Sequence, residues 1–268
     1  MASLCARAVA GIPEVRAGDD LAALIVAALD GQRPRDDRRP IDGERLCDGQ
    51  LVAIAHTVVS KAEGAVRALA DVSPSERAVA LAESATGDAG TDARAIQVAL
   101  DESAEVLRAE RGLLICRTRH GFVCANAGVD ASNAGGDGET VLLLPRDPDA
   151  SARNIRTRLR ELTGAAPAVL ITDSFGRAWR HGQVDVCVGL AGMQPLDDWR
   201  GRADARGMRL RATWLAVADA AAAAADLARA KDSREPVVVI DGLQRFLTDE
   251  DGPGAAALLR PLGEDLFR

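Results

Sequence analysis

Two aspartates follow apolar runs that lie far apart in the chain. Asp130 comes after residues 123–129 (VCANAGV), and Asp173 comes after residues 168–172 (AVLIT). A carboxylate at the end of a strand projects from a rigid scaffold into the cleft where sheets of this kind bind ligands. Divalent cations such as Mg²⁺ take oxygen ligands, commonly one or two carboxylates completed by water and phosphate. Either acid alone is more typical of a turn cap, but the two together predict a shared metal site.

Smaller polar groups and one lysine accompany these acids. Ser174 follows Asp173 directly, and Asn133 lies shortly after Asp130. Lys61 follows an apolar run, so its ammonium could pair with a phosphate as a point charge, although most lysines only solvate a surface. We expect His56 and Thr57 near the end of that run, where the histidine could contact a ligand. Arg180 is close to Asp173 and could instead form a surface ion pair with Asp185.

Several familiar sites are excluded by their missing motifs. The chain has no GxxxxGK[ST] loop and no GxGxxG fingerprint, so it is neither a P-loop protein nor a typical dinucleotide binder. The HExxH and GxSxG signatures are absent as well, which leaves zinc protease and acyl-enzyme chemistry without support. The five cysteines are scattered without a CxxC pair, a pattern that favours a reducing cytoplasm.

Charge and hydropathy limit the possible partners. The formal net charge is -7, whereas a nucleic-acid-binding protein normally carries a basic face. Arg153, Arg156 and Arg160 share one face of an expected helix, and we interpret that face as solvated. No secretory leader and no long apolar span are evident, so we expect no membrane partner and a cytoplasmic location.

Helical and strand-like segments mix without strict alternation, which predicts an α+β fold with mixed sheets and flanking helices. The expected strands are 51–60, 140–145, 165–174, 184–192 and 236–243, with a hairpin over 112–128 that turns near His120. The expected helices are one that starts at 73–76 with Pro74 at its first position, 93–108, one opened by Asp147, and the later part of 212–231. The length allows one large or two small domains, and residues 246–268 are expected to form a linker or a docking segment.

Five blocks of the sequence together resemble the coenzyme F420-0:γ-glutamyl ligase family. They are 11–25, 55–64, 119–134, 172–192 and 195–227, and VCANAGVDASN and ITDSFGR are the most specific stretches. The resemblance covers roughly residues 8–245. It implies two intertwined subdomains, a homodimer, and a ligase that adds L-glutamate to F420-0. In that family GTP activates a carboxylate as an acyl phosphate, with two Mg²⁺ or Mn²⁺ ions and K⁺ as cofactors.

The resemblance also implies roles for particular residues. Asp130 and Asp173 match metal ligands, with Ser174 beside a second metal, and Lys61 joins the two aspartates in catalysis. The matching nucleotide contacts are Ile12, Pro13, Glu14, Val15, His56, Thr57, Lys61 and Asn133.

One segment departs from the family pattern. Residues 228–235 (ARAKDSRE) are basic and contain no glycine, whereas archaeal relatives carry an acidic, glycine-rich nucleotide loop there. A first alternative is therefore a protein that binds a nucleotide or F420 without turnover. In some actinobacteria the ligase is fused to a flavin-dependent reductase-like domain, and the segment LLRPLGEDLFR resembles that junction. A ligase half that works with a separate reductase is the second alternative.

Overall fold

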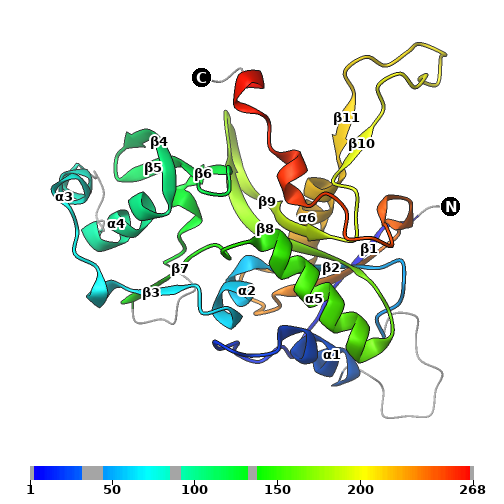
Figure 1. Ribbon diagram of the computed structural model, residues 1–268, viewed down its shortest axis with the longest axis horizontal. Helices are drawn as coiled ribbons and strands as arrows, with labels where there is room; N and C mark the ends of the chain where they lie inside the picture. The colour runs from blue at the N-terminus through cyan, green and yellow to red at the C-terminus, as the bar shows by residue number, and fades with distance from the viewer. Residues whose placement is uncertain (1–2, 32–44, 85–91, 132–137, 266–268) are drawn as a thin grey trace.

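The computed structural model describes residues 3–31, 45–84, 92–131 and 138–265 (Figure 1). Its secondary structure confirms the α+β class, with one five-stranded sheet, three small sheets and helices packed around them. Within these ranges, every helix is too short or too polar to cross a bilayer.

The central sheet joins strands from both ends of the chain. Its order is β1 (Cys5–Ala8), β12 (Val237–Asp241), β2 (Leu51–Ala55), β8 (Ala168–Arg177) and β9 (Arg180–Ala191). β2 and β8 run parallel, and the other neighbours are antiparallel. The predicted strands in 165–174, 184–192 and 236–243 are all present.

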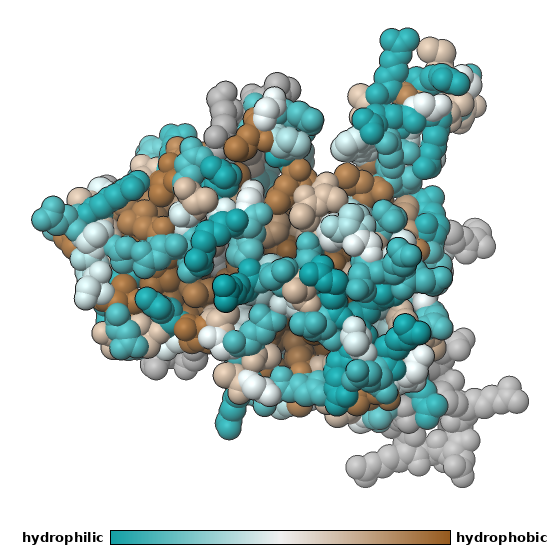
Figure 2. Space-filling model, in the orientation of Figure 1, coloured by the Kyte–Doolittle hydropathy of each residue, from teal (hydrophilic) through white to brown (hydrophobic). Residues whose placement is uncertain are grey.

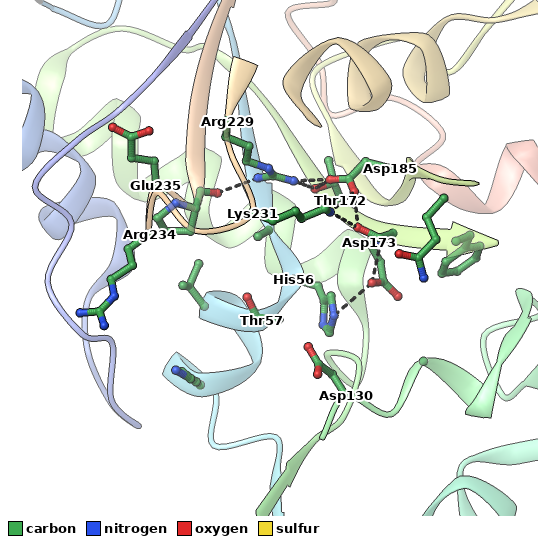
Figure 3. A pocket seen from close by; sticks show the side chains of 18 of the residues that line it. His56, Thr57, Asp130, Thr172, Asp173, Asp185, Arg229, Lys231, Arg234 and Glu235 are labelled. Atoms are coloured by element: carbon green, nitrogen blue, oxygen red, sulfur yellow. Dashed lines mark hydrogen bonds and ion pairs between the residues drawn. The ribbon is translucent and has the colours of Figure 1, made fainter. Parts of the chain in front are cut away.

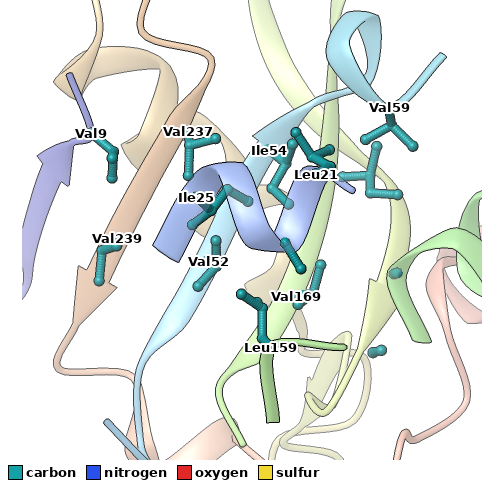
Figure 4. Close-up of a cluster of buried hydrophobic side chains, with 14 of the residues drawn as sticks. Val9, Leu21, Ile25, Val52, Ile54, Val59, Leu159, Val169, Val237 and Val239 are labelled. Atoms are coloured by element: carbon teal, nitrogen blue, oxygen red, sulfur yellow. The ribbon is translucent and has the colours of Figure 1, made fainter. Parts of the chain in front are cut away.

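Helices cover both faces of this sheet, which explains the uninterrupted apolar runs in its strands. Val52 and Ile54 of β2 pack with α1 (Leu21–Gly31) and α5 (Pro148–Thr163) (Figure 4). Leu51 and Ala53 point the other way and pack with α6 (Val217–Ala228). Because successive side chains alternate between faces, every residue of the strand segment 51–54 is buried.

A smaller part of the molecule is formed by the segment between β2 and α5. It contains β3 (Val66–Ala68) paired with β7 (Thr140–Leu142), α3 (Glu76–Glu83), α4 (Ala93–Asp101), and the sheet β4 (Ser103–Glu110), β5 (Leu113–Thr118) and β6 (Val123–Ala125). It has its own buried clusters. Apolar side chains gather on its surface, whereas the face over α5 is largely hydrophilic (Figure 2). The expected hairpin is confirmed as β5 and β6.

Several predicted boundaries are wrong, and three of them concern helices. The strand expected over 51–60 ends at Ala55, and a helix, α2 (His56–Ala62), follows at once. Tertiary packing overrides the β preference of this segment, because Val59 is buried in the main core. The helix expected over 93–108 ends at Asp101, where the Ser103 hydroxyl donates to the Ala99 carbonyl (2.6 Å), and β4 follows.

The third wrong boundary concerns Pro74. α3 begins at Glu76, and its cap is Ser75, whose hydroxyl accepts a hydrogen bond from the Ala78 N–H at 3.2 Å. Pro74 therefore precedes the cap. In α5, by contrast, Asp147 is the cap and Pro148 stands at the first position, as that proline preference requires.

Two further segments complete the chain. The strands β10 (Leu196–Asp198) and β11 (Trp214–Ala216) pair and continue into an arm that projects from the body (Figure 1). The predicted change from strand to helix within 212–231 is confirmed, since β11 leads into α6. After β12 the chain packs back on the core, where Ala255 is buried.

Arg156 holds this C-terminal segment in place. The prediction of a solvated arginine face is wrong for this residue, which is only 7% exposed. Its guanidinium donates to Asp251 (2.8 Å) and to the carbonyls of Pro167, Thr248 and Asp249 (3.0–3.1 Å). An added Cβ on Gly192 would lie 2.5 Å from the Arg156 Nε, so glycine leaves room for the side chain. The segment 248–255 therefore docks on the body.

Replacing Arg156 tests this attachment. Arg156→Met leaves three carbonyls and one carboxylate without their donor, so we expect a loss of about 2 kcal/mol in the free energy of unfolding. Urea denaturation measures the loss, and limited proteolysis should cut first near residues 248–255. Arg153→Met, on the same helix but with a half-exposed side chain, should change stability by less than about 0.5 kcal/mol. Equal effects of the two variants would contradict the buried role of Arg156.

Candidate active site

A cavity of about 1210 Å³ opens where the central sheet meets the smaller part. It collects the predicted site residues that fall within the described ranges (Figure 3). They are Ile12, Pro13, Glu14, Val15, His56, Thr57, Lys61, Asp130, Asp173 and Ser174. Asn133 lies outside the described residues. The cavity exceeds the usual size for one small ligand, so it has room for more than one.

Asp173 and His56 form the centre of this pocket. The expectation that Asp173 stands at the end of the strand over 165–174 is wrong, because β8 continues to Arg177. The Asp173 Oδ1 lies 3.3 Å from the Nε2 of His56 and also accepts a hydrogen bond from the Ser174 N–H (2.8 Å). His56 is buried, with its Nδ1 3.4 Å from the Ser60 hydroxyl. The Asp130 carboxylate faces the same cavity from the smaller part (Figure 3).

A left-handed turn brings Asp130 to the pocket. Asn126, Ala127 and Gly128 have φ angles of 49°, 54° and 73° in succession. Asn126 accepts a hydrogen bond from the Leu114 N–H at 3.1 Å, which fixes the start of the turn. An added Cβ on Gly128 would lie 2.8 Å from the side chain of Leu144. The small residues before Asp130 are thus required by the backbone conformation and by close packing.

Asp130 itself is anchored through its backbone. Its N–H donates to the Leu142 carbonyl (2.9 Å), and its own carbonyl accepts from the Leu142 N–H (2.8 Å). This isolated bridge next to β7 holds the main chain without using the carboxylate. The carboxylate is therefore oriented by the scaffold while it faces the cavity.

A buried carboxylate that the motif analysis did not identify forms the opposite wall. Asp185 of β9 is 1% exposed. It accepts hydrogen bonds from Thr172 (2.8 Å), Ser174 (2.6 Å) and the guanidinium of Arg229. The interpretation of Asp185 as the surface partner of Arg180 is therefore wrong. Asp185 is a single acid within the apolar strand-like run 184–192, much as Asp173 follows the apolar run 168–172. An acid in such a run is the sequence signal that could have identified it.

Two cations from residues 229–231 reach the same wall. Arg229 also donates to the Thr172 hydroxyl (2.7 Å) and to the Pro236 carbonyl (3.0 Å). The Lys231 Nζ lies 2.8 Å from the Ser174 hydroxyl and 3.2 Å from an Asp226 carboxylate oxygen. The basic character of this segment is thus directed into the cavity.

Composition also points to Lys231. Among 33 basic residues the chain contains two lysines, Lys61 and Lys231, and both line this cavity. The Lys61 Nζ is held 2.5 Å from the Oε1 of Glu14, so the two predicted contacts lie together. The scarcity of lysine was the sequence signal for Lys231.

The donor set fits a divalent ion on one side of the pocket. Within the described residues no group of three or more His, Cys, Asp and Glu side chains could enclose a metal. Asp130 and Asp173 nevertheless supply two carboxylates to one cavity, and Mg²⁺ commonly binds through so few protein ligands. Ser174 differs, because its hydroxyl already contacts Asp185 and Lys231. The ligand roles remain predictions.

Cys124 provides a test of the environment next to Asp173. Burial, the Asp173 charge and Cys116 raise the pKa of the Cys124 thiol from 9.0 to about 12. Since the thiolate is the nucleophile, Cys124 should hold about 1000-fold less thiolate than an unperturbed cysteine at pH 8.5. We expect iodoacetamide to label exposed Cys5 and Cys47 while Cys124 reacts only after unfolding in guanidinium. Peptide mass spectrometry locates the label, and labelling of Cys124 at the rate of Cys5 would contradict this environment.

Comparison with known proteins agrees with the motifs in this pocket. The profile of the F420-0:Gamma-glutamyl ligase family matches residues 11–242. A Methanothermobacter thermautotrophicus protein named coenzyme F420:L-glutamate ligase is 43% identical over 97% of each chain. Proteins of the same name from Methanopyrus kandleri and Methanocaldococcus jannaschii are 42% and 39% identical, over 95% and 82% of this chain and 94% and 85% of their own. The chain therefore belongs to the F420-0:gamma-glutamyl ligase family.

Proposed function

We propose that this chain is a coenzyme F420-0:L-glutamate ligase that uses GTP to form the amide bond. The proposal rests on two observations. The chain belongs to this family, and Asp130, Asp173 and both lysines line one and the same cavity. The relatives' printed names supply the coenzyme F420 and L-glutamate substrates. GTP and the acyl phosphate come from the sequence resemblance.

The proposed reaction has two steps. The γ-phosphoryl group passes from GTP to the terminal carboxylate of F420-0, which gives an acyl phosphate and GDP. The amine of L-glutamate then attacks the acyl carbon, the C–O bond to phosphate breaks, and inorganic phosphate leaves as the nitrogen loses a proton. In a further round the γ-carboxylate of the attached glutamate is activated in the same way, and the amine of a second L-glutamate attacks it.

Phosphoryl transfer requires mainly positioning and charge neutralisation, and the pocket offers groups for both. Asp130 and Asp173 would hold a Mg²⁺ or Mn²⁺ ion, which would neutralise phosphate charge. Lys61, paired with Glu14, is placed to bind a phosphate as a point charge. Because His56 is buried against Asp173, it orients that carboxylate toward the cavity.

The same proposal includes the remaining features of the family resemblance. They are a homodimer, K⁺ as a helper ion, residues 1–245 as the ligase unit and a cytoplasmic location. Light scattering measures the dimer, and assays with Na⁺ in place of K⁺ measure the ion requirement.

The direct test is a ligation assay. The protein is incubated with F420-0, L-glutamate, GTP and Mn²⁺, and the products are analysed by mass spectrometry. We expect F420 species heavier by one or more glutamyl residues, with one GDP formed for each bond. Reactions without GTP, or with ATP in its place, define the nucleotide requirement. Folded protein that binds GTP but releases no phosphate would support the alternative of a binding protein without turnover.

Asp130→Asn separates a catalytic role from a turn-capping role. The amide keeps the size of the side chain but removes the charge that a divalent ion needs, so we expect turnover to fall at least about 100-fold. The melting temperature should stay within about 2 °C, because the substitution keeps the two backbone hydrogen bonds between this residue and Leu142. Asp101→Asn, on the exposed end of α4, is the matched control and should leave turnover intact. A large loss of stability in Asp130→Asn with residual activity would instead favour the capping role.

A further inference from the structure

We propose that the ammonium of Lys231 occupies the position of a second divalent ion, so that this chain binds its nucleotide with one divalent ion rather than two. The inference rests on the proposed function. It concerns the wall of the pocket formed by Ser174, Asp185 and the segment 229–231. The family resemblance assigns a second metal to that wall.

The contacts of Lys231 resemble those of a bound cation. Its Nζ lies 2.8 Å from the Ser174 hydroxyl of β8, 3.2 Å from an Asp226 oxygen of α6, and 3.9 Å from the Asp185 Oδ1 of β9. Three elements thus direct oxygen atoms at one ammonium group. An ammonium has three N–H donors and no acceptor, so such an oxygen-lined position suits it.

The charges on this wall are already matched. Asp185 and Asp226 supply two negative charges, and Arg229 and Lys231 supply two positive ones. A divalent ion next to Ser174 would have to approach both cations closely. Such an approach is unfavourable, because like charges at short range repel most strongly where water is excluded, and the side chain of Arg229 is only 10% exposed.

The opposite side of the pocket has a different composition. There Asp130 and Asp173 face the cavity with His56 beside them, and Lys61 is paired with Glu14. The two walls therefore supply positive charge in different ways. A divalent ion would bind on the side of Asp130 and Asp173, and the Lys231 ammonium lies on the side of Ser174. β8 separates them, since Asp173 and Ser174 point to opposite faces of the strand.

The choice of lysine over arginine supports a site-specific role. Arginine supplies 31 of the 33 basic residues, yet lysine stands at this position. A compact ammonium concentrates its charge at one point, as a metal ion does, whereas a guanidinium spreads it over a planar fork. The Lys231 side chain is 69% exposed, so a phosphate oxygen can also reach its ammonium group.

Counting bound metal tests the inference without measuring ligase activity. The protein is equilibrated with Mn²⁺ and a non-hydrolysable GTP analogue and passed through a desalting column. Elemental mass spectrometry and absorbance then give the ions per bound nucleotide. We expect one Mn²⁺ in the natural chain and two in Lys231→Met, because removal of the ammonium exposes the Ser174, Asp185 and Asp226 oxygens. Lys231→Arg, which keeps the charge, should retain one.

The possible outcomes are distinct. Two ions in the natural chain, or one ion in both the natural chain and Lys231→Met, would overturn the proposal while leaving the ligase function intact. Nucleotide bound without any Mn²⁺ would overturn the metal site at Asp130 and Asp173 as well. Arg206→Met, in the projecting arm, removes a positive charge outside the cavity and should still bind one ion.

Discussion

The geometry of the pocket depends on one buried carboxylate. Asp185 is almost fully removed from water, and a carboxylate in such a place is strongly unfavourable unless its oxygens are hydrogen-bonded and its charge is paired. Thr172 and Ser174 satisfy it from the neighbouring strand, and Arg229 reaches it from beyond α6. The position of the segment 229–231 is therefore set by the need to neutralise Asp185, and that segment becomes a wall of the cavity.

The pleat of β8 turns this constraint into two chemically different surfaces. Thr172 and Ser174 lie on the face toward Asp185, while Asp173 lies on the face toward His56 and Cys124. A single strand thus supplies a charge-matched wall and a wall that presents carboxylates to the cavity. Because β8 is held in the sheet by parallel β2 and antiparallel β9, neither surface can shift without the other.

Much of this arrangement could be predicted from the sequence. The features that could not be predicted depend on contacts between residues far apart in the chain. The apolar runs predicted the central strands, and Asp130 and Asp173 were correctly expected in one cavity. The helix at His56 was missed because burial of Val59 decides its conformation. Arg156 and Asp185 were misjudged because their partners lie 95 and 44 residues away. Helical spacing and neighbouring charges cannot reveal such pairs.

The departures from local preference concentrate at the cavity. Among the described residues, five that are not glycine have positive φ angles. Three of them, Asn126, Ala127 and Arg234, belong to segments that line the cavity. The positive φ angle costs Ala127 roughly 1 kcal/mol. Burial of this residue in the cluster with Leu114 and Cys116 helps to offset that cost. Strain of this kind persists only where the surroundings fix the backbone. The core of the smaller part therefore serves to hold the turn before Asp130, just as the core of the central sheet holds Asp173.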